Sequence, residues 1–428
     1  MSDLVKSLNL FKLMESQWWS FERLKKLQDK KLRSIIKYAY ENIPLYHEKF
    51  KDAALMPVDI KTTKDLVKLP FITKEDIQKN YPNGIVASDV DINKCWASHT
   101  SGTTGMPLTV IYDKNAEDFE KATALRPNLS CGQKFFDKWA VITYPDHIGH
   151  KNWFQKFGLF SQEQISLFED TKKQILLLEK IKPDILDGYS SSLYLIAKEI
   201  QASAKKKIRP KIIYGTSEML TTKMRNFINS VFNVEMFDQF GCVEMGRTAW
   251  ECSEHSGYHI DMEAVIMEFI KDNEQVLSRE RGEIVYTNLY NYAMPLIRYR
   301  SGDVGIPTDE KCPCGRGLPL MKNLEGRKDA FFQTPDGRIF PPIIWIVLLM
   351  NYNLEQFKVI QETIEKIKIQ IIPRGTFNQK DIDKIKRETN AVLGNNVVID
   401  VELVGDIPRE KSGKMKTFVS KLGDIGEF

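Results

Sequence analysis

The sequence lacks several features that would assign a protein to a class at once. Its 428 residues include only six cysteines, too few for the disulfide framework of a small secreted domain. The longest apolar run, residues 343–350, is far shorter than the roughly 20 residues that a membrane-spanning helix needs. The N-terminus has no basic stretch followed by an apolar core. We therefore expect a protein of the reducing cytoplasm, with no membrane insertion and no export signal.

An excess of charge of one sign is also missing. The chain carries 61 Lys and Arg residues against 57 Asp and Glu residues, and the two signs are interleaved. This balance does not predict nucleic-acid binding, which relies on a clustered basic surface. Internal repeats and low-complexity stretches are absent as well. What is present is an ordinary globular composition, 42% hydrophobic, over a length that suggests two or three domains.

The spacing of apolar residues divides the chain into three regions. Residues 16–50 show the three- and four-residue spacing of helices. From about 90 to 305, strand-like and helix-like runs alternate, which predicts an α/β domain with a largely parallel sheet. Beyond about 329 the pattern becomes that of a smaller α+β unit. Its predicted elements are a strand at 357–371, a helix at 379–393 and a strand at 397–404. The strands predicted for the α/β region are 139–143, 185–186, 212–214, 235–239 and 283–288, and its helices are 114–126, 171–181, 192–206 and 220–232.

The segment most suggestive of chemistry is Ser98-His-Thr-Ser-Gly-Thr-Thr-Gly105. Glycine lets a backbone approach a phosphate closely, while hydroxyl and backbone N–H groups donate to its oxygens. The segment is not a Walker A loop, because no Gly-Lys-Ser/Thr follows at the required spacing. Taken alone, it is equally compatible with a plain polar turn.

Five motifs in order along the chain set the loop in a wider pattern. They are Thr100–Gly105, Phe240-Gly-Cys-Val-Glu244, Tyr299-Arg-Ser-Gly-Asp303, Gly326-Arg-Lys-Asp329 and Pro408-Arg-Glu-Lys-Ser-Gly-Lys414. Together they resemble the signature motifs of the adenylate-forming superfamily of acyl-CoA synthetases. The resemblance implies an α/β fold in two parts: a large adenylate-forming domain over 1–326, and a smaller, mobile α+β lid domain over 327–428.

A narrower resemblance is carried by two N-terminal segments. Asn42-Ile-Pro-Leu-Tyr46 and Leu69-Pro-Phe-Ile-Thr-Lys74 are similar to motifs of the phenylacetate–CoA ligase branch, which includes capsule-associated and coenzyme-F390-synthetase-like proteins. Many members of the superfamily carry Pro-Lys just after the phosphate loop, whereas this chain has Pro107-Leu108. The phenylacetate branch also lacks that lysine, so the departure fits the branch.

The resemblance implies a nucleotide site. Glu244 would bind Mg²⁺, which prefers oxygen ligands. Asp303 would accept from the two ribose hydroxyls, and Arg327 would reach the ribose or the phosphates. The residues expected to hold the β- and γ-phosphates are Ser101, Gly102, Thr103, Thr104 and Gly105, with Thr104 also counted as catalytic. The residues expected to line the adenine are Gly215, Thr216, Ser217, Glu218, Asp238, Gln239, Phe240 and Gly241.

The resemblance also implies a catalytic lysine and a hinge. Lys414 is expected to lie at the reacting carboxylate and α-phosphate, and its place after Gly413 favours it over the neighbouring Lys411 and Lys416. Asp329 is expected to be the pivot of the lid. Lid movement would bring Lys414 in for adenylation and remove it for acyl transfer.

Four residues form a candidate zinc site. Cys252 and His259 precede the pair Cys312-Pro-Cys314 by some 55 residues, and three thiolates with one imidazole fill a tetrahedral zinc shell. The phenylacetate branch resembles this arrangement. His255 is a rival for the fourth ligand, and unconnected buried cysteines are the alternative. With no open coordination position, the zinc would be structural.

The acid pocket is less clearly marked. Residues 143–153 stand where relatives have a substrate segment rich in glycine and aromatic residues, but here they include His147, His150, an Asp and a Lys. A polar or charged acid would suit such a segment better than phenylacetate would; a surface loop is the alternative. Other residues that could face the acid are Tyr144, Tyr189, Ser190, Ser191, Gly215, Phe240, Arg247 and Trp250, with Tyr144, His147 and Tyr189 the chosen candidates.

The first functional hypothesis is an acid–CoA ligase that uses ATP, Mg²⁺ and CoA, forming acyl-AMP before the thioester. A second transfers the acyl group to an amine or a sugar-linked acceptor, and a third stops at adenylyl transfer. A fourth is a non-catalytic nucleotide-binding protein, which the intact Glu244, Asp303, Arg327 and Lys414 argue against. The relatives suggest a homodimer, while the sequence itself leaves the oligomeric state open.

Overall fold

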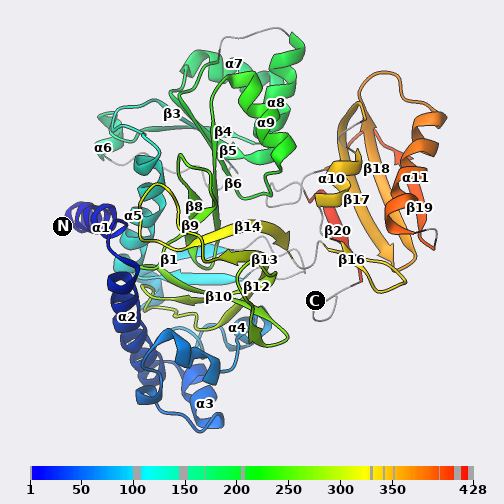
Figure 1. The fold of residues 1–428 in the computed structure, drawn as a ribbon. Coiled ribbons are helices and arrows are strands. Elements are labelled where there is room, and N and C mark those ends of the chain that lie inside the picture. Colours follow the sequence, from blue (N-terminus) through cyan, green and yellow to red (C-terminus); the bar gives the residue numbers. More distant parts are fainter. Residues whose placement is uncertain are drawn as a thin grey trace.

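The computed structural model describes residues 2–99, 108–143, 153–167, 169–203, 208–327, 331–340, 343–349, 352–394, 396–408 and 416–422. Within these ranges, a large N-terminal unit is built on a 12-stranded mixed sheet and a small C-terminal unit on a 4-stranded sheet. The small unit stands to one side of the large one (Figure 1). Two further two-stranded sheets pair β1 (Trp96–His99) with β2 (Thr109–Tyr112) and β15 (Phe332–Gln333) with β16 (Ile339–Phe340).

The chain begins with three helices, α1 (Ser2–Ser16), α2 (Phe21–Asn42) and α3 (Pro44–Asp52). Ser20 is the N-cap of α2, and its side chain accepts from the backbone N–H of Arg23 at 3.3 Å. These helices confirm the helical pattern predicted for 16–50, and α1 precedes it. The next elements are the 3₁₀ turns Pro57–Asp59 and Thr63–Lys68, helix α4 (Lys74–Asn80) and the 3₁₀ turn Ile92–Lys94.

The large sheet has the strand order β11-β10-β12-β13-β14-β9-β8-β7-β6-β5-β3-β4. Strands β4, β3, β5, β6 and β7 are parallel neighbours, while the neighbouring strands from β7 through β8 to β11 pair antiparallel. The parallel strands are β3 (Trp139–Thr143), β4 (Gln162–Ser166), β5 (Ile185–Tyr189), β6 (Ile212–Thr216) and β7 (Met236–Cys242). The others are β8 (Gly246–Glu251), β9 (Tyr258–Ile260), β10 (Val265–Lys271), β11 (Glu274–Gln275), β12 (Gly282–Asn288), β13 (Tyr299–Thr308) and β14 (Leu320–Arg327).

The prediction of a largely parallel sheet therefore holds only for one end of the sheet. All five strands predicted for the α/β region are present, and the predicted helices appear as α5 (Lys114–Ser130), α7 (Thr171–Ile181), α8 (Ser190–Ser203) and α9 (Thr222–Phe232). The alternation of strand and helix stops after α9, because turns join the later strands, and antiparallel neighbours need no helical crossover. A short helix, α6 (Trp153–Lys156), lies between β3 and β4.

Helices cover both faces of the parallel strands. Helices α7, α8 and α9 pack on one face, where Ile213 belongs to their buried apolar cluster (Figure 1). Helix α5 covers the opposite face, where the hydroxyl of Tyr214 donates to the carbonyl oxygen of Asn128 at 3.0 Å. Because successive residues of a strand point to opposite faces, Ile213 faces α7, α8 and α9, whereas Tyr214 faces α5.

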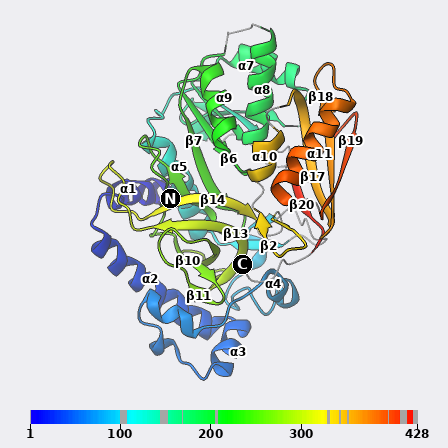
Figure 2. The same ribbon diagram turned by 45° about the vertical axis from the view of Figure 1, so that its right-hand side comes forward.

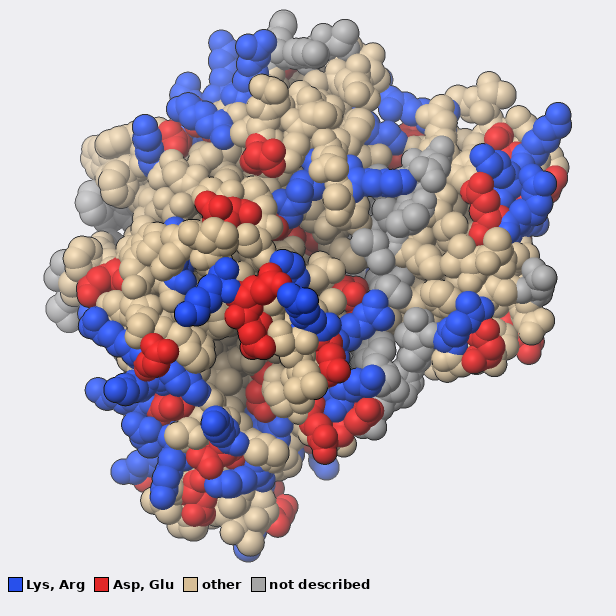
Figure 3. Space-filling model, in the orientation of Figure 1, with Lys and Arg blue, Asp and Glu red and all other residues tan. Residues whose placement is uncertain are grey.

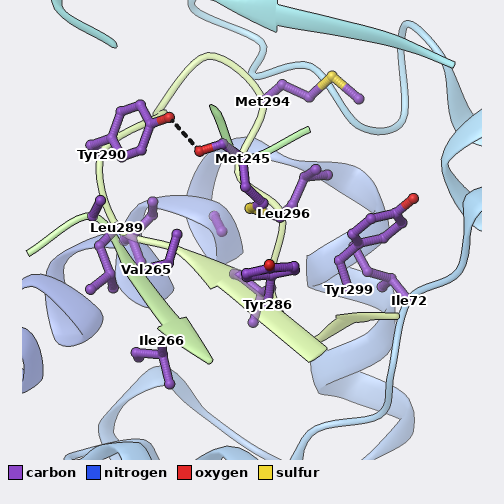
Figure 4. Close-up of a cluster of buried hydrophobic side chains, with 14 of the residues drawn as sticks. Ile72, Met245, Val265, Ile266, Tyr286, Leu289, Tyr290, Met294, Leu296 and Tyr299 are labelled. Atoms are coloured by element: carbon purple, nitrogen blue, oxygen red, sulfur yellow. Dashed lines mark hydrogen bonds between the residues drawn. The ribbon is translucent and has the colours of Figure 1, made fainter. Parts of the chain in front are cut away.

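The antiparallel part of the sheet shares a core with the N-terminal helices. Ile72, Tyr286, Leu296 and Tyr299 are buried together (Figure 4). In the same view the hydroxyl of Tyr290 donates to the carbonyl oxygen of Met245 at 3.0 Å, which satisfies a buried polar atom within the apolar cluster (Figure 4).

The C-terminal unit has the strand order β19-β18-β17-β20. The single strand predicted at 357–371 is wrong: two strands, β17 (Leu354–Thr363) and β18 (Lys366–Pro373), form a tight hairpin there. A long alternating run cannot reveal a short reversal when both strands keep the same period. The helix predicted at 379–393 is confirmed as α11 (Gln379–Leu393), with β19 (Val398–Leu403) after it. The apolar run at 343 forms α10 (Ile343–Leu349), and β20 (Phe418–Ser420) completes the sheet.

The two units meet along α8. In the turned view the C-terminal sheet lies beside the helices of the parallel half (Figure 2), and the Nζ of Lys198 donates to the carbonyl oxygen of Leu354 at 2.5 Å. The boundary predicted at 326/327 falls where β14 ends, at Arg327, and it stays a prediction.

Two observations concern the apolar length of the helices and the charged surface. Among the described helices, none combines the length and the apolar character needed to cross a membrane. On the face drawn in Figure 3, basic and acidic side chains alternate over the large unit.

A buried ion network ties helix α5 to the antiparallel half. The guanidinium of Arg126 is fully buried and pairs with Asp261 and with Glu263, at 2.8 Å between Nη1 and Oε1 for the latter. The hydroxyl of Ser16 in α1 donates to the same Glu263 at 2.5 Å, and the indole of Trp250 donates to Asp261 at 2.8 Å. Burial raises the pKa of Asp261 to about 6 despite the opposing effect of Arg126. The buried carboxyl groups of Asp261 and Glu263 thus both pair with the guanidinium of Arg126.

We expect Arg126→Met to destabilise the large unit by about 3–5 kcal/mol, because it leaves Asp261 and Glu263 buried without a cation. Urea unfolding followed by tryptophan fluorescence measures the loss. Arg279→Met is the matched control: Arg279 is exposed and pairs with exposed Glu310, so its replacement should leave the unfolding midpoint almost unchanged. Equal effects of the two substitutions would contradict this account.

Candidate functional site

The carboxyl ends of β5, β6 and β7 meet at one edge of the sheet. In the strand register, Tyr189 pairs with Thr216, Gly215 with Asp238 and Thr216 with Gln239. The structure thus brings together the two segments predicted to line the adenine, 215–218 and 238–241. The crevice beyond the carboxyl ends of parallel strands is where α/β proteins bind ligands.

The turn between β7 and β8 carries Glu244. Its carboxylate Oε1 accepts from the hydroxyl of Tyr299 at 2.8 Å, and the hydroxyl of Tyr112 holds the turn by donating to the carbonyl oxygen of Val243 at 2.9 Å. Tyr299 begins β13, the strand that also carries Asp303. Burial raises the pKa of the Cys242 thiol, and the negative charges of Glu244 and Asp303 raise it further. The two predicted acidic residues therefore lie near the half-buried thiol of Cys242.

The predicted hinge motif, which begins at Gly326, is linked to Asp303 by the backbone pairing of β13 with β14. Asp303 in β13 pairs in register with Arg327, the last residue of β14. The Asp303 N–H donates to the hydroxyl of Ser301 at 3.1 Å, and the residue is nearly buried. The predicted Mg²⁺ ligand, the predicted ribose ligand and the start of the predicted hinge motif thus converge on one region.

Several predicted adenine contacts have side chains engaged within the protein. Asp238 is buried, and its Oδ2 accepts from the hydroxyl of Tyr258 at 2.6 Å. Burial, followed by the charge of Glu251, raises the pKa of Asp238 to about 7. Glu218 accepts from the backbone N–H of Ser191 at 2.9 Å, at the start of α8. These two carboxyl groups thus have structural roles, and Phe240 packs within the buried apolar core.

Two glycines of these segments lie close to neighbouring groups, and one of them is required by that close approach. A Cβ on Gly241 would lie 2.2 Å from the carbonyl oxygen of Gly246 and 2.8 Å from the Cα of Arg247, both in the neighbouring strand. A Cβ on Gly215 would lie 2.4 Å from the Cε of Met236. The side chain of Met236 can move away, whereas the backbone of β8 cannot. Gly241, the glycine of the Phe-Gly-x-x-Glu motif, is therefore required by its close packing against the backbone of β8.

Several predicted site residues lie outside the described residues. They are Ser101, Gly102, Thr103, Thr104, Gly105, Tyr144, His147, Asp329 and Lys414. The strands that flank the phosphate loop are described, and β1 and β2 pair antiparallel, with His99 opposite Thr109. For these positions, the predicted roles stay predictions.

The four candidate metal ligands are gathered in one cluster. The ligand atoms of Cys252, His259, Cys312 and Cys314 all lie within 4.8 Å of one another. The Nε2 of His259 is 3.3 Å from the Sγ of Cys252 and 3.4 Å from that of Cys314, and the Sγ atoms of Cys252 and Cys312 are 3.5 Å apart. A tetrahedral shell with Zn–S near 2.3 Å requires ligand separations of about 3.5–3.8 Å. The donor set and its spacing therefore fit zinc.

The rival ligand, His255, points elsewhere. Its ring stacks on Phe237, with 5.1 Å between ring centroids, and its Nδ1 lies 3.5 Å from the carboxylate of Glu251. Burial, with a smaller effect of Arg316, lowers the pKa of His259 to about 4, so its imidazole is neutral, the form that coordinates metal. Of the two histidines, His259 is the one with its nitrogen among the thiols.

Helix α5 contributes residues that the sequence analysis did not single out. Asn128 accepts through Oδ1 from the Nε2 of Gln239 at 2.9 Å and from the Nη1 of Arg247 at 3.1 Å. The side chain of Gln239, predicted to line the adenine, thus faces α5. A lone Asn in a helix carries no motif, so only the packing of α5 on the sheet could reveal it.

The architecture matches that of adenylate-forming CoA ligases. The crystal structure of 2-hydroxyisobutyryl-CoA ligase in the postadenylation state superposes with a TM-score of 0.77, covering 95% of this chain and 91% of that one at 17% identity. The fold predicted from the motifs, a large α/β domain followed by a smaller C-terminal one, is therefore confirmed.

Proteins of similar sequence indicate which group of CoA ligases this chain resembles. The phenylacetate–coenzyme A ligase of Thermus thermophilus is 25% identical over 398 residues, covering 90% of this chain and 86% of the relative. Protein CapK of Staphylococcus aureus is 24% identical, covering 92% and 89%. Residues 337–421 match the family described as the CapK C-terminal domain. The predicted resemblance to the phenylacetate–CoA ligase and capsule-associated branch is confirmed.

We expect Gly241→Ala to destabilise the large unit by about 1–3 kcal/mol, because the added methyl group meets the backbone of β8. Thermal and urea unfolding measure the change. Gly405→Ala is the matched control, since a Cβ there meets nothing within 4 Å, and its stability should stay within about 0.5 kcal/mol of the parent protein. An unchanged midpoint for Gly241→Ala would refute the steric explanation for this glycine.

Proposed function

We propose that this chain is an AMP-forming acid–CoA ligase, which activates a carboxylic acid as its acyl adenylate and then transfers the acyl group to CoA. The observation that carries the proposal is that Glu244, in the turn after β7, accepts a hydrogen bond from Tyr299 of β13, the strand in which Asp303 pairs in register with Arg327. It is supported by relatives named as phenylacetate–coenzyme A ligases that align over most of the chain.

The chemistry explains why these groups are needed together. Attack of a carboxylate on the α-phosphorus of ATP brings two anions into contact, so catalysis requires neutralised charge and fixed geometry. We assign the ribose hydroxyls to Asp303, the ribose or phosphate side to Arg327 and Mg²⁺ to Glu244. Magnesium held by Glu244 would supply positive charge at the phosphates, and Tyr299 orients the Glu244 carboxylate by its hydrogen bond. The loop from Ser101 to Gly105 would hold the departing pyrophosphate.

The small unit would act as a lid. We place its boundary at 326/327 and its pivot at Asp329, so that rotation brings Lys414 to the reacting carboxylate for the first half-reaction and withdraws it for the second. The hydrogen bond from Lys198 to Leu354 is one described contact that such a rotation has to break. Cytoplasmic location and assembly as a homodimer stay predictions from the sequence.

A second candidate is acyl transfer to an amine or a sugar-linked acceptor. The observation that favours it is the match of residues 337–421 to the CapK C-terminal domain, because the lid meets the acceptor in the second half-reaction. ATP–pyrophosphate exchange with a panel of acids tests adenylation, which both candidates share. Consumption of CoA with formation of a thioester selects the ligase. Exchange without CoA consumption counts against the ligase, and acyl transfer to an added amine or sugar then selects the second candidate.

We expect Lys414→Ala to lower acid-dependent pyrophosphate exchange by ~100-fold or more while ATP binding is retained, because the variant lacks the cation that stabilises the charge developing at the reacting centre. Exchange kinetics and calorimetric titration with ATP measure the two effects. Lys411→Ala provides the control from the same segment and should stay within about threefold of the parent. Normal exchange by the Lys414 variant would remove that lysine from the mechanism.

We also propose that Cys252, His259, Cys312 and Cys314 hold a structural zinc ion. The cluster lies among buried side chains that include Trp250 and Leu318, and all four ligands would be protein groups. Bound zinc would join the β8–β9 segment to the loop before β14, two segments some 55 residues apart.

Metal analysis of protein purified without chelators should find one zinc per chain. Cys312→Ser should lose most of that zinc and lower the melting temperature by several degrees, because metal binding free energy contributes to folding. Cys95→Ser, which changes a cysteine outside the cluster, should keep the zinc content and the melting temperature of the parent protein. Full zinc content in Cys312→Ser, or a stable wild-type protein without zinc, would count against the site.

A further inference from the structure

The candidate metal cluster is linked to the predicted adenine segment by two residues that stand next to metal ligands in the chain. Glu251 precedes Cys252 at the end of β8, and Tyr258 precedes His259 in β9. The side chains of Glu251 and Tyr258 both hydrogen-bond to Asp238 of β7, which belongs to the segment predicted to line the adenine. The metal cluster and the nucleotide site are therefore connected through two strands.

The alternation of side chains along a strand explains this arrangement. Glu251 and Tyr258 are partners in the register of β8 with β9, so they lie on the same side of that strand pair. Their neighbours Cys252 and His259 point to the opposite side, because successive residues of a strand alternate. One side of the pair thus supplies metal ligands, while the other side supplies the groups that bond Asp238.

The hydrogen bonds around Asp238 fix both its backbone and its side chain. Oε2 of Glu251 accepts from the backbone N–H of Asp238 at 2.8 Å, and the hydroxyl of Tyr258 donates to Oδ2 of Asp238 at 2.6 Å. Glu251 is held in turn by Arg225, whose Nη2 donates to Oε1 at 2.9 Å. Asp238, Glu251 and Tyr258 are all buried, so losing one of these bonds leaves a polar group without water to replace it.

Asp238 also contacts both of the segments predicted to line the adenine. Its Oδ1 accepts from the backbone N–H of Gln239 at 3.1 Å, and its backbone pairs in register with Gly215. A Cβ added to Gly215 would lie 3.5 Å from the same Oδ1. A shift of Asp238 would therefore move the backbone of 215–218 as well as that of 238–241.

Occupancy of the metal cluster would determine how firmly Glu251 and Tyr258 are held. Bound zinc would tie Cys252 and His259 to one centre and so fix both ends of the turn at residues 253–257. Without the metal, the thiol of Cys252 offers only weak hydrogen bonds. The two residues that bond Asp238 would then lose the support of their neighbours in the chain.

We propose that zinc binding and nucleotide binding are coupled through Glu251 and Tyr258, so that the zinc-loaded protein binds ATP more tightly than the zinc-free protein. Glu251 and Tyr258 are positioning residues, because they act through Asp238. The inference rests on the proposed adenylating function and on the proposed zinc site. Such coupling is reciprocal: bound ATP must raise the affinity for zinc by the same factor.

The test measures the coupling in both directions with the full chain. Calorimetric titration with ATP, in excess Mg²⁺ so that the nucleotide does not itself take up zinc, gives the Kd of zinc-loaded and of chelator-stripped protein. Competition with a chromogenic zinc chelator gives the zinc affinity with and without ATP. We expect zinc to tighten ATP binding at least ~5-fold and ATP to tighten zinc binding equally. Returning zinc to the stripped protein should restore the first Kd.

Tyr258→Phe removes the connection without changing a metal ligand. The variant should keep its zinc, raise the KM for ATP at least ~5-fold with kcat retained, and reduce the coupling to less than about twofold. Tyr46→Phe is the matched control: the hydroxyl of this buried tyrosine donates to the carbonyl oxygen of Pro295 at 2.9 Å, so its loss removes a buried hydrogen bond elsewhere. It should keep the coupling of the parent protein even where it lowers stability.

The possible outcomes separate this inference from the two proposals beneath it. Equal ATP affinity of folded protein with and without zinc would overturn the coupling alone, and unchanged coupling in Tyr258→Phe would overturn the route through Asp238. If the stripped protein unfolds, the KM for ATP of zinc-loaded Tyr258→Phe and Tyr46→Phe decides, and equal values overturn the inference. Protein that never contains zinc would overturn the metal site together with the coupling. Folded, zinc-loaded protein that does not bind ATP would overturn the proposed function as well.

Discussion

The arrangement of the site depends on the point where the sheet changes from parallel to antiparallel. Strand β7 runs parallel to β6 and is followed by a tight turn into antiparallel β8, and the backbones approach so closely that Gly241 admits no side chain. Because of this reversal, the turn carrying Glu244 lies beside β13 and the carboxyl ends of β5–β7. A helical crossover there would carry the chain to the next strand's opposite end.

Buried polar interactions tie α5 and the antiparallel half to this turn. Arg126 neutralises Asp261 and Glu263, while two residues further along the same helix Asn128 bonds Gln239 and Arg247. Each interaction leaves buried atoms without a hydrogen-bond partner among the described residues: the Nε of Arg126 and the Oδ2 of Asp261 in the first, the Nδ2 of Asn128 and the Oε1 of Gln239 in the second.

Much of the fold and part of the site could be predicted from sequence. The helix Gln379–Leu393 was recoverable because it repeats one period over its length and begins at a cap, and four of the five parallel strands were recoverable as apolar runs, whereas β4 (Gln162–Ser166) was not predicted. The β17–β18 hairpin was not, since a reversal between two strands of equal period leaves the alternation intact. The candidate acidic residues Glu244 and Asp303 were recoverable because they stand inside motifs, whereas Asn128 stands in none.

The sequence by itself determined the class of chemistry and the residues that could perform it, through ordered motifs and a cysteine–histidine spacing suited to zinc. Only the tertiary structure decided which of those residues meet: His259 rather than His255 beside the thiols, Glu244 bonded to Tyr299, and Gln239 turned towards α5. The physical reason is that local patterns encode periodicity and residue type. Contacts between residues more than 50 positions apart follow from how strands and helices pack, which no local pattern contains.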